Sequence, residues 1–97
     1  PTFPIYERSA LKCGAGTKKV PLREFRQDIG GMLDAVDDST RILFLTNPQN
    51  PTGTNIARDE FQALTDNISD DVLVVMDEAY YEYCPPEDRL ESAGYLG

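Results

Sequence analysis

The chain has 97 residues, of which 40% are hydrophobic and 27% are charged, a composition that fits one small domain with a modest core. Asp and Glu outnumber Lys and Arg by 17 to 9, and the resulting net charge of −8 argues against a sequence-independent grip on nucleic acid or on an anionic membrane. No apolar run approaches the roughly 18 residues that a transmembrane helix needs. We therefore expect a cytoplasmic protein whose partners are small molecules or other proteins.

The cysteine and histidine content argues against a zinc site. Cys13 and Cys84 lie far apart, neither belongs to a CxxC pair, and the chain has no histidine. Two isolated cysteines in an acidic, cytosolic chain are more often free than bonded, so we expect free thiols. The sequence leaves a disulfide between them open.

The first quarter of the chain is predicted to hold one helix and at most one short strand. Pro4 suits the first turn of a helix and Gly14 suits its end, which predicts a helix over roughly residues 4–13. Apolar residues at positions 20 and 22 alternate with their neighbours as in a strand. Because the residue between them is proline, which cannot donate a backbone hydrogen bond, this predicts only a short or edge strand.

A second helix is predicted after Asp28, whose side chain can cap a first helical turn. The apolar residues that follow have the spacing of one helix face: Ile29, Met32, Leu33 and Val36. Glycines at positions 30 and 31 weaken this helix, since glycine loses more backbone freedom than alanine on folding.

The middle of the chain has the pattern of a strand–helix–strand unit. Residues 41–46 and 72–76 are continuous apolar runs, typical of parallel strands that are covered on both faces. A helix is predicted over about residues 57–68, with Glu60 placed as the acid of a capping box, although Ala57 lacks a capping hydroxyl. We expect one right-handed βαβ unit, in which both strands end at the same edge of the sheet. The tail from Cys84 onward has no clear periodicity, and we expect it to leave the core.

Each predicted strand runs directly into a polar motif. Asn-Pro-Gln-Asn-Pro-Thr-Gly at 47–53 follows the first strand, and Asp-Glu-Ala-Tyr at 77–80 follows the second. Because α/β proteins bind ligands at the carboxyl ends of their parallel strands, we expect Asn50 and Asp77 to face one crevice.

The residue types in these motifs suit a small ligand with a cationic ring. A carboxylate at Asp77 would be costly beside such an apolar strand without a cationic partner, and a protonated ring nitrogen would serve. Asn50 offers an amide between two prolines that stiffen the loop. Tyr80 lies three residues beyond Asp77, so a turn could bring its hydroxyl to the same ligand.

Over nearly its whole length the chain resembles the fold-type I pyridoxal-phosphate aminotransferases, and within them the histidinol-phosphate aminotransferases. The motifs at 1–6, 20–22, 47–53 and 77–83 carry the resemblance. It implies an α/β fold of three layers, with a mainly parallel sheet between flanking helices, and residues 1–97 as part of the cofactor-binding large domain. It also implies pyridoxal 5'-phosphate as cofactor, an amino donor such as histidinol phosphate, a 2-oxo acid such as 2-oxoglutarate, and a homodimer.

The resemblance also implies roles for four residues. Phe3 takes the place of the aromatic that stacks on the cofactor ring, and Asp77 that of the carboxylate that pairs with the ring nitrogen. Asn50 and Tyr80 take the places of the two donors to the ring oxygen, and the Asn50–Pro51 bond is often cis in the family. Tyr6 is expected behind Asp77.

The chain departs from the family pattern in its lysines. The resemblance implies that the lysine forming the Schiff base follows Asp77 well downstream, and none lies there before Gly97. The three lysines present, at 12, 18 and 19, are in the wrong part of the sequence. We therefore assign no catalytic residue to this chain and expect it to be inactive by itself, as a central piece of a larger enzyme.

Several alternatives stay open at this stage. An aromatic-amino-acid aminotransferase or a threonine-phosphate decarboxylase of the same fold would share these motifs. An apolar strand followed by Asp77 and Glu78 also fits the magnesium site of nucleotide hydrolases, although residues 14–19 lack the spacing of a phosphate loop. Open strand edges would also suit a non-catalytic interaction module. Each of the four residues also has a structural explanation, such as capping of the next helix by Asp77.

Overall fold

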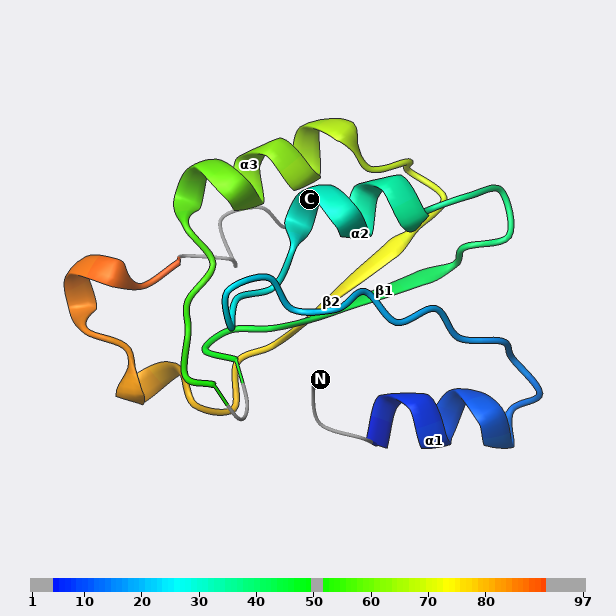
Figure 1. The fold of residues 1–97 in the computed structure, drawn as a ribbon, viewed down its shortest axis with the longest axis horizontal. Coiled ribbons are helices and arrows are strands. Elements are labelled where there is room, and N and C mark those ends of the chain that lie inside the picture. Colours follow the sequence, from blue (N-terminus) through cyan, green and yellow to red (C-terminus); the bar gives the residue numbers. More distant parts are fainter. Residues whose placement is uncertain (1–4, 50–51, 91–97) are drawn as a thin grey trace.

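The computed structural model describes residues 5–49 and 52–90, so Phe3, Asn50 and Pro51 lie outside the described residues. Short 3₁₀ turns at Tyr81–Tyr83 and Pro86–Asp88 follow the last strand. The helices and strands in chain order are α1 at Ile5–Lys12, α2 at Ile29–Ala35, β1 at Ile42–Thr46, α3 at Arg58–Asn67 and β2 at Leu73–Asp77 (Figure 1). The predicted helices and strands are confirmed, with small shifts at their ends. The expectation that both faces of the strands are covered is wrong: Ile42 is 50% and Leu73 62% exposed, and no residue of β2 is buried. These side chains lie on the face away from the core, which the short helix α1 covers only in part.

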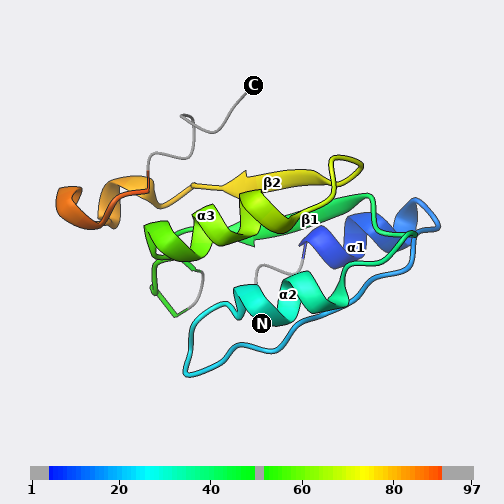
Figure 2. The same ribbon diagram turned by 90° about the horizontal axis from the view of Figure 1, so that it is seen from above.

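Strands β1 and β2 pair in parallel, with Ile42 opposite Leu73 and Thr46 opposite Asp77. Helices α2 and α3 lie on one side of this sheet and α1 on the other, which confirms the α/β class and the flanking helices (Figure 1). Seen from above, α2 and α3 run side by side along the strands (Figure 2). The second strand ends on Asp77 itself, one residue later than predicted, so the carboxylate belongs to the sheet edge.

The core lies between the sheet and the pair α2 and α3. Alternate strand residues point to this side, as the two-residue repeat of a strand requires. Leu45, Leu64 and Leu90 are its most completely buried side chains. Around them pack Ile29, Met32, Ile56 and Phe61, with Leu43, Val74 and Met76 partly buried at the margin.

Asp28 caps α2 as predicted, and its position explains a glycine in that helix. The Asp28 Oδ1 atom accepts a hydrogen bond from the backbone N–H of Gly31 at 3.0 Å. A Cβ atom on Gly31 would stand 2.7 Å from Asp28 Oδ2 and 3.1 Å from Val20 Cγ1. The capping carboxylate therefore occupies the space that a side chain at position 31 would need.

Glu60 acts at the start of α3 as predicted from its position. Its Oε2 atom accepts a hydrogen bond from the backbone N–H of Ala57 at 2.9 Å, which satisfies one of the unpaired donors of the first turn. The same atom pairs with the Arg26 guanidinium at 2.9 Å. A capping box has two side-chain hydrogen bonds, one from each end of the first turn. Ala57 makes no side-chain cap hydrogen bond, so only the bond to the Glu60 carboxylate is present here.

The strand suggested at residues 20–22 does not form. The chain instead makes a tight antiparallel turn, with a bridge between Arg23 and Arg26. Glu24 and Phe25 have positive φ values of 51° and 64° within that turn. Val20 packs against the core beside α2, so packing rather than sheet pairing holds this segment.

The expectation that the tail leaves the core is wrong. Leu90 is only 1% exposed and belongs to the central cluster, and Cys84 is 4% exposed. The 3₁₀ turns reverse the chain, and Arg89 ties the reversal together by donating from Nε to the Cys84 carbonyl at 3.0 Å. A turn without helical or strand periodicity leaves no pattern by which to predict this return.

Both thiols are free, with Cys13 exposed and Cys84 buried, as expected. Over residues 5–49 and 52–90, no helix combines the length and the apolar character needed to cross a bilayer.

Replacing Leu64 by alanine should lower the free energy of unfolding by about 2–5 kcal/mol, because the side chain is fully buried between α3 and the sheet. Denaturant titration of the variant measures this change. Leu11→Ala on α1, where the leucine is 59% exposed, is the matched control and should change stability by less than about 0.5 kcal/mol. Equal effects of the two changes would contradict this description of the core.

Candidate functional site

The candidate site lies where the two parallel strands end. The backbone N–H of Asn47 donates to the Asp77 carbonyl at 2.9 Å, so the loop after β1 is bonded directly to the last residue of β2. Asn47 is buried, and its Oδ1 accepts the backbone N–H of Ile56 at 2.9 Å. The first asparagine of the motif therefore closes the loop against the residues that directly precede α3.

The loop that carries the first motif folds back on itself. Gln49 donates its N–H to the Thr54 carbonyl at 2.8 Å and accepts the N–H of Gly53 at 2.6 Å. Gly53 has a φ of +73°, a conformation that glycine adopts without steric cost. The Asn47–Pro48 peptide is cis. Asn50–Pro51, where the family suggests a cis bond, lies outside the described residues.

The carboxylate of Asp77 is held by two neutral donors. Its Oδ2 accepts the hydroxyl of Tyr6, as expected from the resemblance, and its Oδ1 accepts the N–H of Ala79 at 3.0 Å. The second bond is a local turn, so Asp77 also has part of the structural role considered above. Across the described ranges, no lysine or arginine forms an ion pair with it. An ionised carboxyl group offers about four acceptor positions, so Asp77 keeps capacity for a cationic donor.

Tyr80 lies three residues beyond the end of β2 and is half exposed. Its ring centroid lies 5.9 Å from that of Tyr83. Together with Pro48 and Gly53, the two tyrosines line an open hollow of about 440 Å³. The structure thus brings Tyr80 to the Asn-Pro loop, whereas Asp77 is not among the residues that line this hollow.

The local sequence gave no signal for the partners of Thr46. Gln27 Nε2 donates to the Thr46 carbonyl at 2.5 Å, and its Oε1 accepts the Thr46 N–H at 3.2 Å. The side-chain amide of Gln27 is thus hydrogen-bonded to both backbone polar groups of the last residue of β1. Gln27 lies 19 positions before Thr46, in a turn with no periodic pattern, so only the fold reveals the pairing.

The phenol of Tyr6 sits in a partly buried environment under the sheet. Burial raises the pKa of this phenol above its ordinary value, and the hydrogen bond to the Asp77 carboxylate raises it further. A hydrogen bond with the Thr46 side chain acts in the opposite direction, and the charge of Asp77 adds a final upward contribution. The neutral phenol, which donates to Asp77, is therefore the favoured form.

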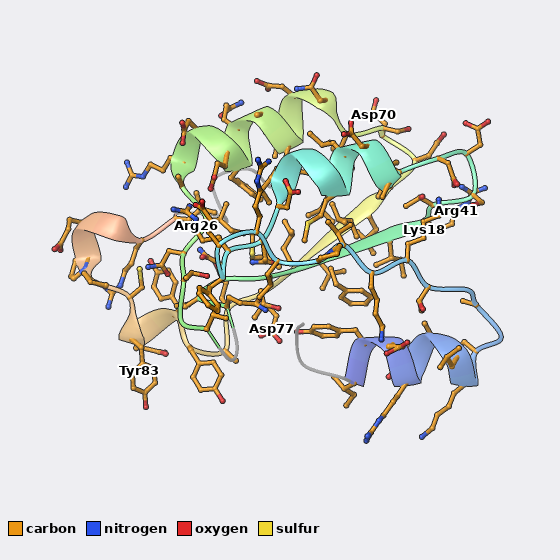
Figure 3. All side chains as sticks on the ribbon, in the orientation of Figure 1. Lys18, Arg26, Arg41, Asp70, Asp77 and Tyr83 are labelled. Carbon is orange, nitrogen blue, oxygen red and sulfur yellow. The ribbon has the colours of Figure 1, made fainter. Side chains whose placement is uncertain are left out.

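Two of the three lysines form ion pairs with acids other than Asp77. Lys18 donates to the Ala35 carbonyl at 3.0 Å and forms a 2.5 Å ion pair with Asp37, before β1 begins. That ammonium group holds the pKa of the Asp37 carboxyl well below its usual range. Lys19 pairs with Glu7 at 2.8 Å. Figure 3 shows Lys18 well away from Asp77 along the sheet.

Comparison with known protein families gives a match over nearly the whole chain. The family described as aminotransferase class I and II matches residues 1–95. The histidinol-phosphate aminotransferase of Geobacillus thermodenitrificans is 46% identical over 96 residues, which are 99% of this chain and 26% of that protein. The enzyme of the same name from Listeria welshimeri is 47% identical over 88 residues, covering 90% of this chain and 24% of that protein.

A solved structure shares the fold. The histidinol-phosphate aminotransferase of Sinorhizobium meliloti, in complex with pyridoxal-5'-phosphate, superimposes with a TM-score of 0.83 at 28% identity. The match covers 91% of this chain and 24% of that one. The chain thus spans about a quarter of the length of the curated relatives it matches.

The raised pKa of Tyr6 predicts a loss of stability in alkali. The folded state keeps the phenolic proton above pH 10, where the unfolded chain releases it, so this stabilisation is complete below pH 10 and is lost as pH rises through the folded pKa. Tyr6→Phe should therefore show a flatter decline of the free energy of unfolding above pH 10. Denaturant titrations over that range test this, with the exposed Tyr83→Phe as the control that should follow the parent chain.

Proposed function

Because the chain belongs to the class I and II aminotransferases, we propose that it is part of a pyridoxal-phosphate-dependent enzyme that moves an amino group between an amino compound and a 2-oxo acid. The names of the relatives at 42–47% identity support histidinol phosphate as the amino donor. The acceptor is a 2-oxo acid such as 2-oxoglutarate. The family match over residues 1–95 carries this proposal, and the Asp77 carboxylate at the sheet edge agrees with it.

The residues at the sheet edge fit this cofactor. Asp77 has an acceptor position left and no cationic partner among the described residues, which suits the protonated ring nitrogen of pyridoxal phosphate. Tyr80 would donate its hydroxyl to the ring oxygen from the turn that follows β2. Asn50 and Phe3 would supply the second donor and the stacking ring, and these two assignments rest on the sequence motif alone.

The chemistry proposed for the site depends on the charges at the ring nitrogen and the ring oxygen of the cofactor. When bound, pyridoxal phosphate supplies a ring that takes up the electrons left when the substrate loses its α-proton. Asp77 would hold the proton on the ring nitrogen through one of its carboxylate oxygens, which keeps the ring electron-poor. Asn50 and Tyr80 would stabilise negative charge on the ring oxygen. The chain's own residues thus orient the cofactor and set its charge.

The lysine that binds the cofactor covalently would come from a part of the enzyme beyond these residues. Lys18 and Lys19 are paired with acids elsewhere on the fold. We propose that the chain by itself does not transaminate. Incubation with pyridoxal phosphate, an amino donor and a 2-oxo acid should yield no product, and repeated turnover would contradict the proposal.

The complete enzyme is proposed to be a cytoplasmic homodimer, as the resemblance implies. The acidic charge of this segment agrees with the absence of a nucleic-acid or membrane partner in the proposal. Sedimentation of the complete enzyme tests the oligomeric state.

Replacing Asp77 by alanine in the complete enzyme should lower turnover by roughly a hundredfold to a thousandfold, because the ring nitrogen loses the charge that keeps it protonated. Steady-state rates with histidinol phosphate and 2-oxoglutarate measure this. Asp70→Ala is the matched control: Asp70 is exposed and lies before β2, at the other end of the strand. An unchanged rate in the Asp77 variant would remove this residue from the mechanism.

A further inference from the structure

Asp77 is one end of a chain of contacts that begins on the neighbouring strand. We infer that Tyr6 and Thr46 are positioning residues for Asp77: Thr46 fixes the phenol of Tyr6, and the phenol fixes the direction of the carboxylate. The inference rests on the proposed function, since it concerns how Asp77 is presented to the cofactor ring. The geometry of strands β1 and β2 and helix α1 carries it.

Thr46 and Asp77 lie on one face of the sheet, and Tyr6 of α1 packs against that face. In parallel strands, residues in register point to the same side, so Thr46 and Asp77 both face away from the core and toward α1. The Tyr6 ring comes from the first turn of α1 and stacks on Phe44, two residues before Thr46, with ring centroids 4.6 Å apart and planes inclined by 10°. This stack holds the phenol beside both strand ends.

The phenol has a defined donor and a defined acceptor. Its hydroxyl donates to Asp77 Oδ2 and also forms a hydrogen bond with the Thr46 side chain. Because Asp77 is an acceptor, the phenolic proton points to it, and the threonine hydroxyl can donate to the phenol oxygen. The hydrogen bonds then run in one direction, from Thr46 through Tyr6 to Asp77.

The position of Thr46, where this series of hydrogen bonds begins, is fixed by other contacts. Both backbone polar groups of Thr46 are bound by the amide of Gln27, on the edge of β1 that faces away from β2. On the edge of β1 that faces β2, the backbone N–H of the next residue, Asn47, donates to the Asp77 carbonyl. Thr46 is 4% exposed and is thus held from both sides, so its hydroxyl has a constant position relative to the carboxylate.

These contacts leave the Asp77 carboxylate little freedom to rotate. One oxygen is bonded to Tyr6 and the other to the N–H of Ala79, so rotation about the Cβ–Cγ bond would break both bonds. The remaining acceptor positions keep a constant direction. A group held in the productive orientation before binding avoids the entropy cost of ordering it afterwards.

The test uses the complete enzyme that contains this segment. Tyr6→Phe keeps the ring that stacks on Phe44 and removes only the hydroxyl. The dissociation constant of pyridoxal phosphate, measured by titrating the apoenzyme, should rise about tenfold, within the range for a lost hydrogen bond to a charged group. The ¹⁵N shift of labelled cofactor should show that the ring nitrogen loses its proton at lower pH than in the parent.

Two further variants keep the outcome decisive. Thr46→Val has nearly the shape of threonine, so it removes the first donor with little change in packing, and it should weaken cofactor binding in the same direction by about threefold. Ser9→Ala is the matched control, because it removes an exposed hydroxyl from the same helix α1, and it should bind within twofold of the parent. A role confined to folding would lower thermal stability and leave the ring-nitrogen shift unchanged.

Asp77→Asn separates failure of this inference from failure of the proposed function. If Asp77→Asn weakens binding and shifts the ring-nitrogen titration while Tyr6→Phe and Thr46→Val do neither, the positioning role is wrong and the proposed function stands. If Asp77→Asn itself leaves both quantities unchanged, the proposed function fails at this residue, and the inference that rests on it fails too.

Discussion

The parallel register of β1 and β2 is the constraint on which the rest of the site depends. It sets Thr46 opposite Asp77, and the Asn47 N–H bonds the carbonyl of that same aspartate. A shift of one residue in this pairing would turn Asp77 toward the apolar side of the sheet, where a carboxylate would lack partners. The core formed by α2, α3 and Leu90 holds this register by fixing the alternate residues of both strands.

The two faces of the small sheet separate the hydrophobic core from the proposed cofactor site. The side toward α2 and α3 carries the buried leucines, whereas the side toward α1 carries Phe44, Thr46 and Asp77. The side toward α1 is supported by one short helix and is more exposed, with Phe44 accessible over 37% of its surface. Polar groups at the sheet edge are satisfied by Tyr6, Gln27 and Ala79, so the edge can present a charge without destabilising the core.

Much of the fold could be predicted because its elements are local and periodic. The apolar runs at β1 and β2 and the Asp28 cap gave strong signals, and the Asn-Pro and Asp-Glu-Ala-Tyr motifs marked the sheet edge. The return of Leu90 to the core and the turn at Glu24 and Phe25 could not be predicted, because long-range packing and positive φ values decide them. The same holds for Gln27, whose amide finds a strand end through tertiary contact alone. The cofactor-binding roles of Phe3, Asn50, Asp77 and Tyr80 remain predictions.

The contact between Tyr6 and Asp77 joins residues that are 71 positions apart. During synthesis, α1 is made well before its partner carboxylate, so the contact can form only after Asp77 has been added to the chain. Interactions of such large sequence separation close expensive loops and belong to the slow steps of folding. We therefore expect the side of the sheet toward α1 to be organised late in folding, so that agents that capture incompletely folded chains would encounter it with α1 still undocked.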